Sequence, residues 1–170
     1  MINEEMQKVL LNWWTRLQEN NGGRAQLRRC NSPEEAVIHS ETYRLKNMLP
    51  KWISLEAIAT IAGVSAHIKN DTSLGFAKSL ATPKEKNGRV PLSESRFRQL
   101  LSCREWDELY RSLRRTVSIL DGNVNLISFA DTVLLWKNEF RGNSKKPGKG
   151  LKFELSRDYY ETVINNEKKN

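Results

Sequence analysis

The sequence is poor in the features that mark secreted and membrane proteins. Its 170 residues include two cysteines, Cys30 and Cys103, which stand far apart. Reduced thiols in the cytoplasm are the simplest interpretation of such isolated cysteines. No stretch approaches the roughly 18 consecutive apolar residues that cross a bilayer. The first residues, MINEEMQK, are acidic and lack the apolar core of a signal peptide. We therefore expect a cytoplasmic protein without a membrane span.

The sequence also lacks the residue patterns that carry most enzyme chemistry. The two histidines, His39 and His67, have no second metal-ligating residue at the spacing of a zinc site, and no CxxC occurs. The phosphate-binding patterns GxxxxGKS/T and GxGxxG are absent. The acidic pairs Glu34–Glu35 and Asp107–Glu108 consist of adjacent residues, which point in different directions on a helix. We expect no catalytic residue, no metal site, no cofactor and no enzymatic activity.

Positive charge, in contrast, is abundant. Lysine and arginine number 28 against 20 aspartates and glutamates, which gives a formal net charge of +8, and 38% of the residues are hydrophobic. A chain of this length makes one ordinary domain or two small ones. The excess of positive charge points to an anionic partner, which is nucleic acid, an acidic membrane surface or an acidic protein.

Apolar residues recur at helical spacing along most of the chain, and no segment alternates as a strand does. One stripe ends at the sequence NNGG of residues 20–23, which predicts a helix terminus there. Ser32 before Pro33 is typical of a helix N-cap. The sequence predicts an all-α fold. The three strongest stripes are Met6, Val9, Leu10, Trp13 and Leu17; Trp106, Leu109, Leu113, Val117 and Leu120; and Leu126, Phe129, Val133, Trp136 and Phe140.

Residues 54–69 offer one alternative function. The segment LEAIATIAGVSAHIKN has the Ala59 and Gly63 spacing of a helix-turn-helix motif. The motif requires an apolar residue six positions after Gly63. In this chain that position is Lys69, and the apolar Ile68 comes one position early. A stand-alone helix-turn-helix-like DNA-binding regulator is therefore the alternative hypothesis, against a buried alanine-rich helix. A metal-dependent nuclease ranks third because the chain has no carboxylate and histidine cluster.

The basic residues form three clusters that contain few acids. The first is GGRAQLRR, with Arg24, Arg28 and Arg29 in six positions. On a helix whose inward face is Leu109, Leu113 and Val117, residues Arg104, Arg111 and Arg115 of the second cluster would project together from roughly the opposite side, with Arg114 nearby. Such clusters predict a track that neutralises phosphates without reading sequence. Most tryptophans lie in the apolar stripes, so we assign them to packing. The second and third clusters are Arg104, Arg111, Arg114 and Arg115, and then Lys137, Arg141, Lys145, Lys146, Lys149, Lys152 and Arg157.

The order of these motifs resembles a known family. WWTRLQENNGGRAQLRR is followed by LGFAKSLA, SRFRQLL, LYRSLRR, a tryptophan-containing helix and a basic C-terminal segment. The same order is similar to that of the CasB family, the small subunit of the type I-E Cascade complex of CRISPR immunity. The similarity extends over nearly the whole chain. The segments ATPKEKNGRVP and RGNSKKPGKG depart from the family pattern.

The resemblance implies an all-helical fold of two small bundles, with residues 1–82 and 93–170 joined by a linker at 83–92. It implies a non-catalytic subunit that associates with a second copy of itself and with the large and backbone subunits. Its partners would be CRISPR guide RNA and target DNA, held by backbone contacts that stabilise the R-loop, including the displaced strand. The resemblance assigns nucleic-acid contacts to Arg29, Arg96, Arg98, Arg114 and Arg115. Charge clustering alone adds Arg24, Arg28, Arg104, Arg111, Lys137, Arg141, Lys145 and Lys146.

Overall fold

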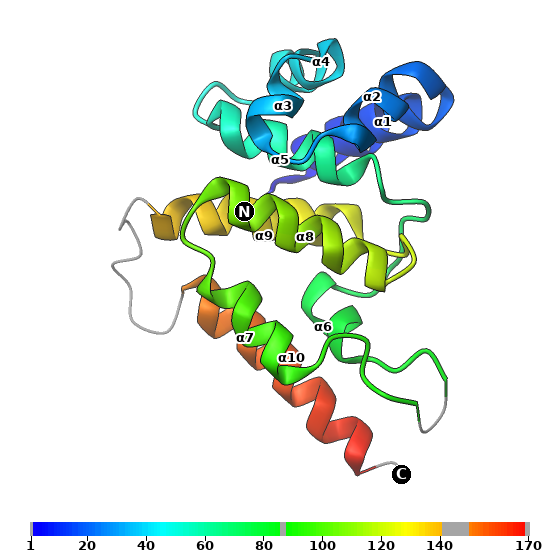
Figure 1. Ribbon diagram of the computed structural model, residues 1–170, viewed down its shortest axis with the longest axis vertical. Helices are drawn as coiled ribbons and strands as arrows, with labels where there is room; N and C mark the ends of the chain where they lie inside the picture. Colours follow the sequence, from blue (N-terminus) through cyan, green and yellow to red (C-terminus); the bar gives the residue numbers. More distant parts are fainter. Residues whose placement is uncertain (1, 86–87, 141–149, 169–170) are drawn as a thin grey trace.

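The computed structural model describes residues 2–85, 88–140 and 150–168, and it confirms the all-α prediction. These residues contain helices and no strand, with one isolated bridge between Asn70 and Asn123. Figure 1 shows three tiers: α1 to α5 at the top, α8 and α9 in the middle, and α6, α7 and α10 below. The helices are α1 (Glu4–Glu19), α2 (Asn21–Arg29), α3 (Pro33–Val37), α4 (Ser40–Met48), α5 (Leu55–Ser65), α6 (Phe76–Ala81), α7 (Glu94–Ser102), α8 (Trp106–Ile119), α9 (Leu126–Phe140) and α10 (Leu151–Glu167).

The helix α5 lies at the centre of the upper and middle tiers. Every residue from Ala57 to Ala66 is buried, and the helix packs against α3, α4, α8 and α9. Because alanine has a small side chain and glycine has none, these neighbours can approach closely. At Gly63 a Cβ atom would lie 2.1 Å from the hydroxyl oxygen of Tyr110 in α8, so only glycine fits there without a shift. The prediction of a buried alanine-rich helix is confirmed.

The helix terminus predicted at residues 20–23 is correct for the end of α1. The prediction that Gly22 and Gly23 lie between helices is wrong. Asn20 ends α1, but the two glycines lie inside α2, because the Asn20 side chain accepts a hydrogen bond from the Gly23 amide at 3.0 Å and starts the next helix. Glycine at position 23 lets α2 approach α4, since a Cβ atom there would lie 2.8 Å from Glu41. One asparagine thus turns the chain and sets the direction of the arginine-bearing helix.

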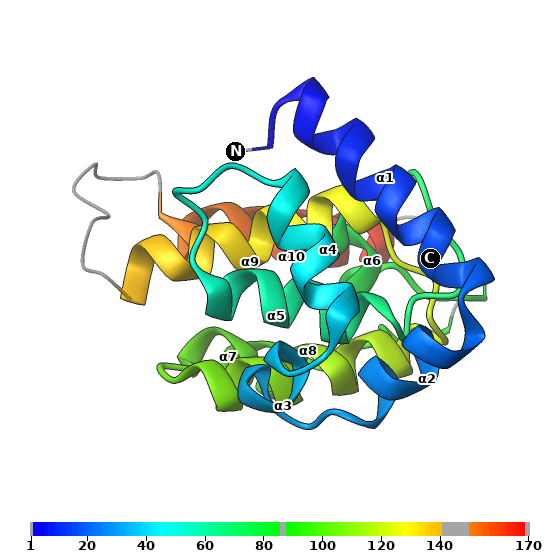
Figure 2. The ribbon, with the colours of Figure 1, turned by 90° about the horizontal axis from the view of Figure 1, so that it is seen from above.

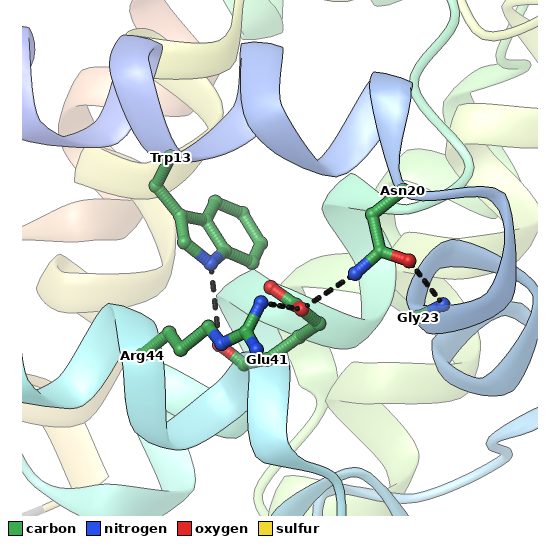
Figure 3. A network of polar contacts seen from close by, with 5 residues as sticks. All are labelled: Trp13, Asn20, Gly23, Glu41 and Arg44. Atoms are coloured by element: carbon green, nitrogen blue, oxygen red, sulfur yellow. Dashed lines mark hydrogen bonds and ion pairs between the residues drawn. The ribbon is translucent and has the colours of Figure 1, made fainter.

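A buried carboxylate ties α1, α2 and α4 together (Figure 3). Glu41 is 5% exposed, and its carboxylate accepts from the Asn20 amide and from Arg44 at 2.8 Å each. Its backbone carbonyl accepts from the indole N–H of Trp13 at 3.2 Å. A buried charge needs such partners to offset its loss of hydration. The network fixes α2 on the upper tier and so fixes where its arginines emerge.

The lower tier is held by aromatic packing between α7 and α10. The rings of Phe97 and Tyr159 stack at 4.0 Å, and the Tyr159 hydroxyl donates to the Leu92 carbonyl at 2.6 Å. The α6 helix, which precedes residues 83–92, packs against α10. One apolar cluster includes buried residues from all three tiers. The division into two bundles at residues 83–92 stays a prediction.

Candidate nucleic-acid interface

The α8 helix has a buried side and a cationic side. Leu109, Leu113 and Val117 are fully buried, as the apolar stripe predicted. Arg111 and Arg115 are exposed and stand one turn apart, where two like charges repel by a few tenths of a kcal/mol. An anion bound between them would remove this repulsion.

The exposed side of α8 forms a groove with α7. Two adjoining hollows, of about 230 and 310 Å³, follow the groove and share Gln99, Ser112 and Arg115 as lining residues. Arg111 lines the first hollow and Arg96 of α7 lines the second. The tertiary structure therefore brings together three predicted cations from two helices. We call this the α7/α8 groove.

The groove has the chemistry of a phosphate site. Guanidinium groups donate charge-assisted hydrogen bonds to phosphate oxygens, and the Gln99 amide and the Ser112 hydroxyl add neutral donors. Glu108 also lines the first hollow and offsets part of the positive charge. The sequence analysis missed Gln99 and Ser112. Gln99 lies three residues after Arg96, so placing α7 on a helical wheel would have found it.

Two other predicted cations lie near this groove in different settings. Arg98 is exposed and forms an ion pair with Glu94 one turn earlier in α7. Arg104 is also exposed, but it precedes α8, whose N-cap is Glu105. The prediction that Arg104 shares the helical face of Arg111 and Arg115 was therefore wrong, because the helix starts after it.

Arg24 holds the end of α5. Its Nε donates to the Ala66 carbonyl at 3.1 Å, and its Nη2 donates to the Ile68 carbonyl at 3.2 Å. Carbonyls at the end of a helix have no partner within it, so the guanidinium supplies one. Burial, and after it the charge of Arg28, lowers the pKa of Arg24. The structure thus gives Arg24 a structural role that the sequence did not reveal.

Arg114 also makes contacts within the protein. Its Nη1 donates to the Cys30 carbonyl at 3.2 Å and to the Asn31 side-chain oxygen. These bonds join α8 to the turn after α2. Arg28 and Arg29 at the end of α2 are exposed. The Arg114 side chain therefore points toward α2 and away from the side of α8 that carries Arg111 and Arg115.

His67 lies where the positive charges of arginines from α2 and α8 act together. Burial first, and then the charges of Arg114, Arg28 and Arg24 in that order, lower its pKa to about 4. Three arginines from two helices therefore act on one point. With the α7/α8 groove on the other side of α8, the cations extend from α7 across α8 to α2, and Figure 2 shows these helices along one edge of the molecule.

Lys137 lies in the interior, away from this edge. It is 5% exposed, its ammonium donates to the Trp52 carbonyl at 2.6 Å, and it lies 5.5 Å from the centre of the Trp52 ring. This position does not favour a phosphate contact. Arg141, Lys145, Lys146 and Lys149 of the third predicted cluster lie outside the described residues, and Lys152 and Arg157 are exposed on α10.

The structure gives no recognition helix at residues 54–69. Residues 57–66 are buried in the core, and the next helix, α6, begins only at Phe76. A helix-turn-helix protein needs an exposed second helix that enters the major groove. Within the described ranges, no three His, Cys, Asp or Glu side chains are close enough to share a metal ion. None of the helices in those ranges is both long and apolar enough to cross a membrane.

One of the comparisons with known proteins identifies a family. The family model described as CRISPR-associated protein Cse2 matches residues 23–160, which include α7, α8 and most of α2. No curated protein and no solved structure matches the chain. A match over most of the chain is what a member of the family shows. The chain belongs to the Cse2 family, the CasB small subunit of the type I-E Cascade complex.

Proposed function

We propose that the chain is a non-catalytic subunit of an RNA-guided DNA surveillance complex, in which its cationic edge binds the nucleic-acid backbone and stabilises the R-loop. The observation that carries this proposal is the α7/α8 groove. Arg96, Arg111 and Arg115 from two helices line it together. Backbone contacts of this kind hold a strand in place and do not read its sequence.

The energetics of strand exchange make such contacts sufficient. Replacing a DNA duplex by an RNA–DNA hybrid is nearly balanced in free energy, so negative supercoiling and protein contacts to the backbone decide how far opening proceeds. Each phosphate neutralised by an arginine also releases condensed counterions, which adds a salt-dependent gain. A small basic subunit can thus tip the equilibrium without chemistry of its own.

The proposal includes the partners that the family implies. The cationic edge meets guide RNA, target DNA or the displaced strand, and other surfaces meet the large subunit, the backbone subunits and a second copy of the chain in the cytoplasm. The exposed Arg28 and Arg29 extend the track beyond the groove. Arg24 and Arg114 shape it from within because their guanidinium groups bind backbone carbonyls.

The test is charge reversal in the assembled complex. Arg111→Glu with Arg115→Glu leaves the buried side of α8 intact, and surface substitutions change the free energy of unfolding by only about 0.5 kcal/mol each. The complex should assemble and retain its guide RNA. On a matched duplex it should open less DNA, and thymines of the displaced strand, probed with permanganate, should report fewer open complexes. Within the complexes that open, those thymines should be more accessible.

A matched control reverses the same number of charges elsewhere. Lys8 and Arg16 are exposed on α1, and they line neither hollow of the α7/α8 groove. The pair Lys8→Glu with Arg16→Glu should leave strand opening unchanged. Unchanged opening with the α8 double variant fully incorporated would refute the proposal. Failure of that variant to assemble would show that this edge meets a protein subunit.

A further inference from the structure

The α10 helix has two apolar sides, and only one of them is used by the fold. Leu151, Leu155 and Tyr159 are buried against α6, α7 and α9. Phe153 on another side is 64% exposed, and Ile164 is 48% exposed. At 100° per residue, these two residues lie within about 20° of each other around the helix. An apolar side of this kind on an exposed helix marks a binding surface.

The exposed side contains an open hollow with aromatic and cationic walls. Lys152, Phe153, Ser156, Arg157 and Tyr160 line it, and most of its lining is apolar. We call it the α10 hollow. Its lining residues all belong to α10, whereas those of the α7/α8 groove belong mainly to α7 and α8, and the two sites share no residue.

The Tyr160 ring is held rigidly at this site. Its hydroxyl donates to Glu94 of α7 at 3.1 Å, and Glu94 is also the ion-pair partner of Arg98. The centre of the ring lies 5.9 Å from that of Phe97 and 5.2 Å from that of Tyr159, and it is nearly perpendicular to both rings. A ring fixed by three neighbours loses little further freedom when a ligand stacks on it, which favours binding.

The charges around the hollow are sorted by sign. Lys152 and Arg157 border the apolar residues, about 140° apart around the helix. The acids Glu154, Asp158 and Glu161 fall on the third side of α10, between Arg157 and the buried side. Arg157 contacts Asp158 at 3.3 Å. Arg157 is exposed and Asp158 is half-buried, and ion pairs near the surface are weak, so Arg157 can turn to an anion without a large cost.

We propose that the α10 hollow binds unpaired nucleobases, so that the protein recognises single-stranded nucleic acid at a site separate from the α7/α8 groove. A base would stack on Phe153 or Tyr160, and the adjoining phosphates would meet Lys152 and Arg157. Alternating aromatic and cationic groups are how proteins hold single strands without sequence preference. This proposal rests on the proposed function, in which unpaired strands are present in the R-loop.

The chemistry of the hollow favours a single strand over other occupants. A duplex keeps the faces of its bases stacked and presents only charged backbone and groove edges, which cannot fill an apolar hollow. A protein helix would need an apolar stripe bordered by acids to match Lys152 and Arg157. A single strand carries flat apolar faces and negative charge on every residue of its chain, which matches both features.

The test measures the affinity of the full-length chain for three probes of equal length by fluorescence anisotropy. They are oligothymidine, the same backbone with abasic residues, and a duplex. Phe153→Ala should weaken binding to oligothymidine at least about five-fold, the loss typical of one stacked base. Binding to the abasic backbone and to the duplex should be unchanged. Phe153→Trp retains a ring and should restore the affinity.

Ile164→Ala is the matched control, because Ile164 lies on the same side of α10 but outside the hollow. It should leave all three affinities unchanged. Equal weakening of all probes by Phe153→Ala, or no weakening of oligothymidine, would overturn the proposal. Failure of both Phe153→Ala and Ile164→Ala to assemble with other subunits would also overturn it, because that result would assign this side of α10 to a protein partner. The proposed function fails separately, if reversal of Arg111 and Arg115 leaves strand opening unchanged.

Discussion

The α7/α8 groove predicts how strongly salt controls the affinity for nucleic acid. The perturbation is neutralisation of its three cations by Arg96→Gln, Arg111→Gln and Arg115→Gln. All three residues are exposed and line one groove. None of them belongs to the apolar core, so each change should alter the free energy of unfolding by about 0.5 kcal/mol or less. Thermal denaturation and helix content check that the fold is kept.

The magnitude depends on the number of arginines. If each one neutralises a phosphate of a duplex, the slope of log K against log salt concentration contains about −0.9 for each, or roughly −2.7 for three. Between about 50 and about 200 mM salt, that part of the slope corresponds to a loss of roughly 40-fold in affinity. The triple variant should bind more weakly at low salt, and its affinity should fall less steeply with salt because it lacks this contribution to the slope.

The assay is a titration of the full-length chain into a labelled duplex at several salt concentrations. Duplexes of different sequence should give the same slope, because backbone contacts read no bases. Equal slopes for the wild-type chain and the triple variant would refute the assignment of these arginines to phosphates. A preferred sequence, with mismatches costing about 1–3 kcal/mol each, would refute backbone recognition itself.

Arg24 provides the contrasting case. Arg24→Gln removes the guanidinium that binds the Ala66 and Ile68 carbonyls, and both of these residues are 0% exposed. Leaving a buried acceptor without a partner costs about 1–3 kcal/mol, so the unfolding temperature should fall. The salt slope should remain that of the wild-type chain. If Arg24→Gln flattens the slope and keeps the stability, the division into structural and phosphate-binding arginines is wrong.

Three further predictions concern the core and the chemistry. Gly63→Ala gains about 1 kcal/mol of helix propensity but places a methyl group 2.1 Å from the Tyr110 hydroxyl oxygen. We expect a net loss of roughly 1–3 kcal/mol, read by denaturant unfolding, and a more stable variant would contradict this. The pKa of His67 is lowered to about 4 by burial and neighbouring arginines, so the unfolded state binds the additional proton. Stability should therefore fall as the pH decreases from about 6.5 to about 4, by less than about 3 kcal/mol because the ring is partly solvated; a pH profile unchanged in His67→Gln would contradict this. The purified chain should not cleave nucleic acid with Mg²⁺ or Mn²⁺, and metal-dependent cleavage lost in one carboxylate variant would overturn the non-catalytic assignment.

The sequence by itself determined the fold class and most helices, because helical packing leaves a period of 3.6 in the order of apolar residues. Leu109, Leu113 and Val117 are buried as their spacing requires, and the Ser32 hydroxyl accepts from the Glu35 amide as an N-cap should. These features depend on residues within one or two turns. The order of motifs likewise indicated the family that the family model identifies.

Only the tertiary structure decided which cations remain exposed. Arg24 and Arg28 stand one turn apart on the same short helix, yet Arg24 binds the Ala66 and Ile68 carbonyls just after α5 and Arg28 is exposed. Lys137 looked like a surface cation but contacts Trp52, a residue 85 positions away. A partner so distant leaves no trace in local spacing.

The same holds for the α7/α8 groove. Arg96 joins Arg111 and Arg115 because α7 packs beside α8. Phe153 and Tyr160 stand seven residues apart on α10, so their spacing already places them on one side, and the contact with Glu94 of α7 holds the Tyr160 ring there. The sequence supplied the arginines and the aromatic rings in helices of the right period. The arrangement of the arginines into a groove came from contacts between helices, which depend on the whole core and which no single segment encodes.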